Sequence, residues 1–246
     1  YYGEASFEGL LIAIAHKARW QTRREVLETL FPIGTLSTLP DREFRAGLAE
    51  CLKHGLLDSS PGADGRTHLT WITDSLDRIL AREPAVLVEL IARSVAFKAG
   101  VVRGDERETA ESGGGRALLN LGHTFAHAIE TLHHLSPTDN PGDAPLLHGE
   151  AVGLGLVACA TTAVRMGLAP AALPEQISTL LTRCWLPASV RGLPDGAQLL
   201  ALMGADKKTT GGKLRLVLPC KTHHARAVEI LDHAPVLAGW DAIRME

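Results

Sequence analysis

The segment NLGHTFAHAIE, residues 120–130, carries two histidines at a spacing that suits catalysis or metal binding. His123 and His127 stand four residues apart, so a helix would place both imidazoles on one face. Such a pair can supply two metal ligands, or one ligand beside an acid/base group. The spacing is that of the zinc-peptidase motif HExxH, but Thr124 stands where that motif has its glutamate. Without that general base, the zinc-peptidase interpretation is excluded.

Two further segments hold candidate metal ligands at a distance in the sequence. His148 begins the stretch HGEAV, where we expect an apolar helix after a proline-rich loop. Glu50 lies in the stretch ECLKH, three residues before Lys53. One glutamate and two histidines, with a position left open to water or substrate, make an ordinary catalytic zinc site. Glu50, His123 and His148 could form one only if the fold joins three distant segments.

Each of these residues also has a plainer interpretation. A single histidine on a helix is often a surface or boundary residue, and we expect this for the doublets at 133–134 and 223–224. Glu50 and Lys53 could be only a solvated ion pair within one helix, worth about 0.2–0.5 kcal/mol. The residue types alone leave these alternatives open.

Basic residues that could bind phosphate or carboxylate groups are Lys98, Arg116, Lys207 and Lys208. Lys98 could instead be a cation favoured near the C-terminal end of a helix. Lys207 and Lys208 fall in an expected turn, where a charged surface is the usual explanation. Arg116 follows a glycine run at 113–115.

The elements that must position these residues are mostly helical, because apolar residues recur at helical spacing. Pro84 suits the first turn of a helix, and Asp41 is expected to cap the helix that carries Glu50. Two short segments have strand character and could pair as a hairpin near the C-terminus. The fold class is therefore mainly α. The expected helices are 41–57, 80–102 with a break at Pro84, 116–135, 148–167, 172–184 and 196–203, and the expected strands are 214–219 and 227–230.

Composition supports this fold class and excludes several partners. Hydrophobic residues make up 46% and aromatic residues 4% of the 246 residues, a balance that favours helices over sheets. The formal net charge is -3 and no basic stripe is present, so no nucleic acid is expected as a partner. No apolar run is long enough to span a membrane, so no membrane is expected as a partner. The four cysteines form no CxxC pair, which indicates reduced thiols and a cytoplasmic location.

Taken in chain order, these segments resemble the C-terminal helical domain of the 3-dehydroquinate synthase family, a group of sugar phosphate cyclases. The resemblance covers about residues 35–220, and its most specific part is the segment 120–130 followed by HGEAV. The matching stretches are LPDRE at 39–43, GLAECLKHG at 47–55, KAGVV at 98–102, DERE at 105–108, RALLNLGHT at 116–124, HAIE at 127–130, HGEAV at 148–152 and DKK at 206–208.

The resemblance implies roles for individual residues. Glu50, His123 and His148 correspond to the three protein ligands of a divalent metal, zinc or cobalt. His127 and Glu108 correspond to positions of acid/base work. The positions that contact substrate are matched by Lys53, Lys98, Arg116, Asn120 and His127, and Lys207 matches a lysine near the substrate phosphate.

The resemblance also implies an activity, that of a carbon–oxygen lyase in the shikimate pathway. The family converts a small anionic substrate, a seven-carbon keto sugar-acid phosphate (DAHP), into 3-dehydroquinate and phosphate. NAD oxidises a hydroxyl transiently, phosphate is eliminated, the hydroxyl is restored, and an aldol step closes the ring. NAD returns unchanged, so it acts as a cofactor. The family is usually homodimeric, and a homodimer is therefore expected.

The domain organisation departs from that of the family. We expect the helical metal- and substrate-binding domain at 35–246, preceded by a segment at 1–34 that is a remnant or a linker. That segment contains candidate helices at 7–16 and 23–30. The family's NAD-binding domain is expected to be absent, because no glycine-rich run precedes residue 113.

Three alternatives to a complete dehydroquinate synthase remain at this point. The chain could belong to another cyclase that makes an inosose, valiolone or amino-dehydroquinate product. It could be a non-catalytic helical fragment that binds metal without turnover. It could also be a relative of iron-containing alcohol dehydrogenases, which would consume NAD rather than regenerate it. Titration with NAD and measurement of NAD consumption separate the three.

Overall fold

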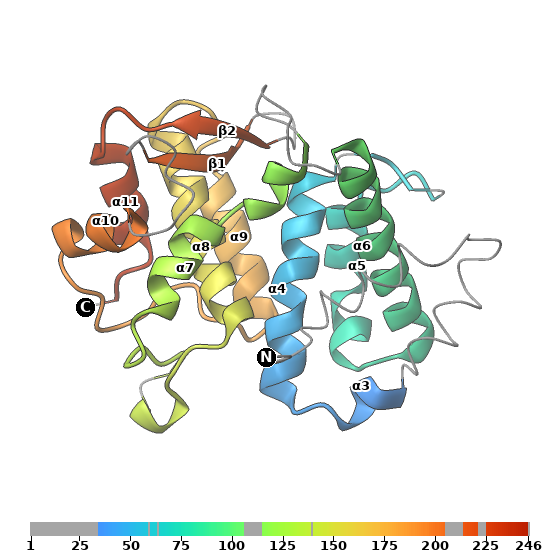
Figure 1. Cartoon of the computed structure of the whole chain (residues 1–246). Helices are drawn as coiled ribbons and strands as arrows, with labels where there is room; N and C mark the ends of the chain where they lie inside the picture. Colours follow the sequence, from blue (N-terminus) through green and yellow to red (C-terminus); the bar gives the residue numbers. More distant parts are fainter. Residues whose placement is uncertain are drawn as a thin grey trace.

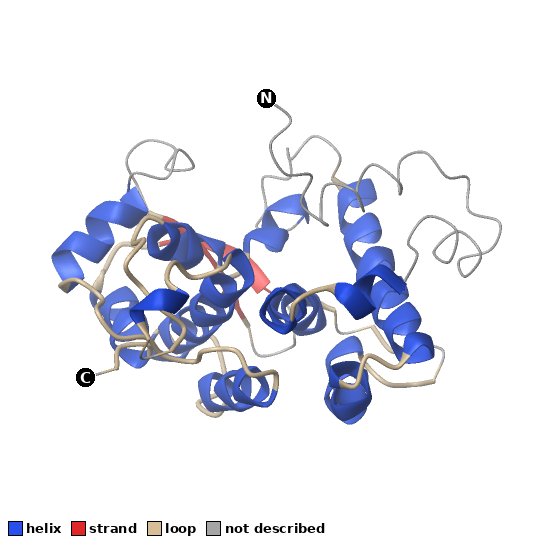
Figure 2. Cartoon of the chain, turned by 90° about the horizontal axis from the view of Figure 1, so that it is seen from below, coloured by secondary structure: helices blue, strands red, loops and turns tan. Residues whose placement is uncertain are grey.

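The computed structural model describes residues 34–58, 60–62, 64–105, 115–138, 140–204, 214–220 and 225–245. Helices make up most of this part of the chain, and the two strands lie together (Figure 2). The predicted fold class, mainly α with a small hairpin near the C-terminus, is confirmed. In chain order the elements are α3 (Gly34–Thr38), α4 (Asp41–Leu57), α5 (His68–Leu80), α6 (Pro84–Gly104), η1 (Gly115–Asn120), α7 (His123–Glu130), η2 (Pro141–Asp143), α8 (His148–Arg165), α9 (Leu173–Arg183), α10 (Gly196–Gly204), β1 (Arg215–Pro219), β2 (Ala225–Glu229) and α11 (Ala234–Ala242).

Helix α4 runs between two groups of helices (Figure 1). On one side it contacts α5 and α6, and on the other it contacts α8. Every residue from Leu52 to Leu57 is buried, so the C-terminal half of α4 is covered all round. This position places Glu50 and Lys53 inside the molecule and not on a solvated helix face.

Helix α8 forms the centre of the second group. Its sequence carries no charged residue between Glu150 and Arg165, and nearly all of its residues are buried. A helix that is apolar all round must be covered on every side, and α8 contacts α4, α7, α9, α11 and β1. None of the helices within the described ranges combines the length and apolar character needed to cross a membrane.

The C-terminal elements cover α8 from the remaining sides. Strands β1 and β2 pair antiparallel, from Arg215 opposite Glu229 to Pro219 opposite Ala225. The Sγ of Cys159 on α8 donates a hydrogen bond to the carbonyl oxygen of a β1 residue, at 2.9 Å. All four cysteines are free, as the sequence predicted. The hairpin therefore closes the core over α8 and needs no disulfide.

The helices differ from the prediction at α5 and at the segment 116–135. The structure has a separate helix α5 where the sequence predicted none, with the side chain of Thr67 accepting a hydrogen bond from the backbone N of Thr70 at 3.2 Å. The predicted helix 116–135 is broken into η1 and α7 because Gly122 lies between them with φ of +77°. A non-glycine residue is strained in that left-handed region.

Asp41 does not cap α4 as predicted. It is the first residue of the helix, after Pro40 at the N-cap, and no side chain caps this end. The carboxylate instead pairs with Arg82 at 2.8 Å. The candidate helices at 7–16 and 23–30 lie outside the described residues.

Candidate metal centre

Three helices bring Glu50, His123 and His148 together. Glu50 lies in the third turn of α4, while the two histidines are the first residues of α7 and α8. Glu50 Oε1 is 3.6 Å from His123 Nε2 and 3.9 Å from His148 Nε2. One candidate ligand atom from each residue lies within 4.8 Å of the others. Tetrahedral zinc, with bonds of about 2.0–2.2 Å, holds its ligand atoms roughly 3.3 Å apart, so these separations suit one ion.

Glycines allow the three helices to approach so closely. A Cβ at Gly149, next to His148, would overlap the carbonyl oxygen of Ala46 on α4. A Cβ at Gly155 on α8 would overlap the carbonyl oxygen of Gly122, just before His123. Backbone therefore meets backbone on both sides of α8, and the ligand positions follow from helix positions that cannot shift freely.

The carboxylate of Glu50 has unused acceptor capacity. It is mostly buried, and Oε1 accepts no hydrogen bond within the described part of the chain. Oε2 lies 2.6 Å from the Nζ of Lys53, a close ion pair, while Oε1 faces the two imidazoles. A buried carboxylate needs a compensating charge or donor. Lys53 supplies that charge at Oε2, and a divalent cation between Glu50 and the two histidines would engage Oε1, so the residues fit a metal.

His123 is held in the form that a metal ligand requires. Its Nδ1 lies 3.2 Å from the carbonyl oxygen of Leu121, which leaves Nε2 facing Glu50. Burial, and next the charge of Lys53, lowers the pKa of His123 to about 4. The imidazole is therefore neutral at physiological pH, with a lone pair available for coordination.

His148 has a carboxylate partner on its other ring nitrogen. Its Nδ1 lies 2.8 Å from Glu130 Oε1 at the end of α7. Burial by itself would raise the pKa of the Glu130 carboxyl, but the hydrogen bond with His148 and the nearby imidazoles bring that pKa below its usual value. A carboxylate that hydrogen-bonds the ring nitrogen not facing the metal orients a metal-binding histidine. No role was predicted for Glu130 from the sequence, although it stands seven residues after His123 and so shares its helix face.

Two of the lysines predicted to bind substrate, Lys53 and Lys98, are not surface residues. Lys53 is 1% exposed and Lys98 is 6% exposed, so the solvated-pair interpretation of Lys53 is wrong. Lys98 also lies before the last turn of α6 and is buried, which does not fit its interpretation as a cation near the C-terminal end of the helix. After burial itself, the charges of Lys53 and Lys98 depress the pKa of buried His54, so both ammonium groups act on that imidazole.

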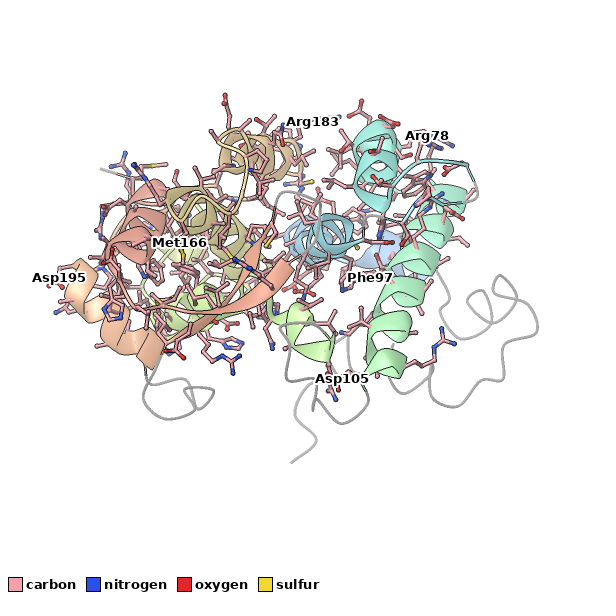
Figure 3. The ribbon with its side chains drawn as sticks, turned by 90° about the horizontal axis from the view of Figure 1, so that it is seen from above. Arg78, Phe97, Asp105, Met166, Arg183 and Asp195 are labelled. Carbon is pink, nitrogen blue, oxygen red and sulfur yellow. The ribbon has the colours of Figure 1, made fainter. Side chains whose placement is uncertain are left out.

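Some of the remaining predicted site residues lie in the described part of the chain and others do not. Arg116 and Asn120 are half-buried on η1, and the His127 ring lies 5.6 Å from the His123 ring, centroid to centroid. Asp105, just beyond α6, accepts a hydrogen bond from the backbone N of Arg116 at 3.1 Å and so fixes the start of η1 (Figure 3). Glu108 and Lys207 lie outside the described residues. The histidines at 133–134 are exposed, as expected, and those at 223–224 are not described.

Comparison with known proteins places the chain in a family. The family model described as 3-dehydroquinate synthase C-terminal matches residues 47–209. The 3-dehydroquinate synthase of Xylella fastidiosa (strain M12) is 43% identical over 205 residues, covering 82% of this chain and 51% of that protein. The enzyme of the same name from Laribacter hongkongensis (strain HLHK9) is 42% identical over 209 residues, covering 85% and 51%. The chain spans about half the length of the curated relatives it matches.

Two solved structures share the fold. One is 2-epi-5-epi-valiolone synthase from Streptomyces hygroscopicus subsp. jinggangensis 5008 with NAD+ and Zn2+ bound, at a TM-score of 0.66 and 20% identity over 86% of this chain and 54% of that one. The other is 2-deoxy-scyllo-inosose synthase complexed with carbaglucose-6-phosphate, NAD+ and Co2+, at a TM-score of 0.52 and 18% identity over 78% and 50%. The sequence matches are more specific. By its match to the family model at residues 47–209, the chain belongs to the 3-dehydroquinate synthase family.

Proposed function

We propose that this chain forms the metal- and substrate-binding part of a 3-dehydroquinate synthase. The reaction is the conversion of a seven-carbon keto sugar-acid phosphate (DAHP) into 3-dehydroquinate with release of phosphate, a lyase step of the shikimate pathway. The observation that carries the proposal is the meeting of Glu50, His123 and His148 from three helices, in a chain of this family. A cytoplasmic location and a homodimer belong to the proposal through the family resemblance.

Glu50, His123 and His148 would hold the divalent cation, zinc or cobalt. The cation would act as a Lewis acid toward a hydroxyl or carbonyl oxygen of the substrate. The side chain of Glu50 is 20% exposed and that of His123 is 11% exposed, whereas that of His148 is 43% exposed. The three-ligand site is therefore open to solvent on the His148 side, where a substrate oxygen could approach the cation.

Basic and amide side chains would bind the substrate. Lys53, Lys98, Arg116 and Asn120, with Lys207 from outside the described residues, would hold its phosphate and carboxylate groups. The burial of Lys53 and Lys98 supports this role, since a buried ammonium group interacts more strongly with an anion than an exposed one.

His127 and Glu108 would transfer protons. The His127 ring stands edge-on to the His123 ring, beside the ligand set but outside it. This position suits a group that accepts or returns a proton on the substrate while the other two histidines bind metal. NAD would supply the transient oxidation, bound mainly by a half of the enzyme that this chain does not contain.

Two alternatives remain distinguishable. Another cyclase product, of the inosose, valiolone or amino-dehydroquinate type, is less favoured because the relatives that are 42–43% identical are 3-dehydroquinate synthases. A non-catalytic metal-binding fragment would bind zinc without binding NAD. Membership of the dehydroquinate synthase family decides against the alcohol dehydrogenase alternative.

The test is a turnover assay on the protein at the length its coding region specifies, since the region upstream of Tyr1 decides whether an NAD-binding segment adjoins the chain. With zinc or cobalt, NAD and DAHP, we expect phosphate release that matches 3-dehydroquinate formation, with no net NADH. A chelator should stop both. Metal binding without NAD binding or phosphate release would contradict the proposal and favour the non-catalytic alternative.

A further inference from the structure

One face of α4 meets the first turn of α8 along three consecutive contacts. The α4 residues are Arg42, Ala46 and Glu50, spaced by four, so they form a stripe on one face. Arg42 bonds to Glu150, Ala46 lies against Gly149, and Glu50 faces His148. The last contact belongs to the candidate metal centre, while the first lies two helical turns away from it.

The Arg42–Glu150 contact is a two-point ion pair. Arg42 Nε donates to Glu150 Oε1 at 2.8 Å, and Arg42 Nη2 donates to Glu150 Oε2 at 2.8 Å. The Glu150 side chain is only 4% exposed, whereas that of Arg42 is 38% exposed. A planar guanidinium that engages both carboxylate oxygens fixes orientation as well as distance.

Both partners also bind the backbone that leads into α8. Glu150 Oε2 accepts a hydrogen bond from the backbone N of Leu147 at 2.8 Å. Arg42 Nη2 donates a further hydrogen bond to the carbonyl oxygen of Pro145 at 2.9 Å. Residues on both sides of His148 are thus tied to α4 through one guanidinium and one carboxylate.

We propose that Arg42 and Glu150 are positioning residues that set the register of the first turn of α8 on α4, and so place the His148 imidazole beside Glu50 for a shared cation. The inference rests on the metal-binding function proposed above. One residue of helix is a rise of about 1.5 Å, whereas metal–ligand distances tolerate about 0.2 Å. A small slip of α8 along α4 is therefore enough to impair the site.

A purely structural ion pair makes a different prediction. Its loss would lower the stability of the protein, but the molecules that remain folded would bind metal normally. Loss of a positioning pair lowers the metal affinity of folded protein and changes the coordination geometry. Cobalt(II) distinguishes the two, because its visible absorption spectrum reports the arrangement of its ligands.

The experiment titrates cobalt into the metal-free chain and follows calorimetry and the visible spectrum, with circular dichroism as the check on folding. The main variant is the double substitution Arg42→Met and Glu150→Met, which removes both charges together and leaves neither buried alone. Arg42→Lys, which keeps the charge but loses the two-point geometry, is the milder variant. Asp41→Asn is the matched control, since Asp41 occupies the same turn of α4 but pairs with Arg82 and Arg45.

We expect the double variant to bind cobalt at least about 10-fold more weakly than wild type, as loss of ligand support typically does, with an altered spectrum. Arg42→Lys should show a smaller loss in the same direction, and it carries the test if the double variant does not fold. Asp41→Asn should match wild type. Wild-type affinity and spectrum in a folded double variant and in Arg42→Lys would overturn this inference alone. Failure of the wild type to bind cobalt would overturn the proposed function as well.

Discussion

The two sides of α4 are packed in different ways. Toward α8, backbone touches backbone at Gly149, and the polar groups are paired, Arg42 with Glu150. Toward α5, the contact is looser, since a Cβ at Gly55 would stand 3.0 Å from the Leu69 Cα. On that side the buried imidazoles of His54 and His68 have no hydrogen-bond partner within the described residues.

The difference indicates which side of α4 must keep its geometry. Closely approached helices with small residues cannot slide without overlap, so the side that carries the metal ligands is the rigid one. The α5 side is held by large apolar side chains such as Trp71, Leu76 and Ile79, which can adjust to small changes. Disturbing the first side should damage the metal centre, whereas disturbing the second should damage only stability.

The largest effect is expected from the ligands themselves. Glu50→Gln, His123→Ala and His148→Ala should each reduce bound metal from about one ion per chain to near zero, because three protein ligands are the minimum of a stable open site. His127→Ala should keep its metal and lose turnover. Metal analysis of purified variants measures this. A full metal content in His148→Ala would remove that histidine from the ligand set.

The packing contrast is tested with Gly149→Ala and Leu76→Ala. Gly149→Ala should lower the free energy of unfolding by about 3 kcal/mol through overlap with Ala46, and weaken metal binding in the molecules that fold. Leu76 is fully buried, and Leu76→Ala should cost about 3 kcal/mol through the cavity it leaves. Its metal affinity should stay at the wild-type value.

Gly47→Ala is the control for these two substitutions. Gly47 lies on α4, and a Cβ added there would meet nothing within 4 Å, so alanine should be neutral or stabilise by up to about 1 kcal/mol. Denaturant unfolding and cobalt titration give the two readouts. Equal losses of metal affinity in the Gly149 and Leu76 variants would show that the two sides do not differ as described.

The unpartnered histidines make the α5 side sensitive to acid. Burial lowers the pKa of His68 to about 4. The unfolded chain, with an ordinary histidine pKa of about 6.5, takes up the proton first. The contribution of the neutral His68 side chain to the free energy of unfolding is therefore complete above about pH 6.5 and is lost as the pH falls toward 4. Between pH 7 and 4.5 the loss should be about 2 kcal/mol.

His68→Leu is the variant that isolates this effect. It keeps an apolar side chain of similar size and has nothing to protonate, so its unfolding free energy should fall less steeply with acid. Denaturant titrations at several pH values compare its slope with that of wild type. Identical pH profiles would mean that His68 is not buried in its neutral form.

The smallest effect is expected from Glu130→Gln. The amide can still accept a hydrogen bond from His148 but carries no charge, so it orients the ring and makes it a weaker ligand. We expect an approximately 10-fold loss of metal affinity with unchanged stoichiometry. Calorimetric titration with zinc measures it. Unchanged affinity would limit Glu130 to a surface contact.

The long apolar elements were predictable from the sequence, but their breaks were not. The end of α4 at Leu57 was predicted as found, and His148 was expected at the start of a helix, because apolar periodicity and proline-rich flanks are local signals. The break at Gly122 depends on the approach of α8 from more than thirty residues away along the chain. A local sequence pattern does not predict a contact between residues so far apart in the chain.

The candidate site was predictable only in part for the same reason. Glu50, His123 and His148 were named from residue types, spacing and the family resemblance, and the structure brings them together. Glu130 and the Arg42–Glu150 pair received no role, since each works through a partner on another helix. All three residues stand within the matching stretches, but those stretches carry no sign of which side chains meet.

The central claim is that Glu50, His123 and His148 share one cation. The most direct measurement is a crystal structure of the chain grown with cobalt, with diffraction data collected on both sides of the cobalt absorption edge. The account predicts one strong anomalous peak within about 2.0–2.2 Å of Glu50 Oε1 and the Nε2 atoms of both histidines. A peak bound elsewhere, or none between these three side chains, would contradict it.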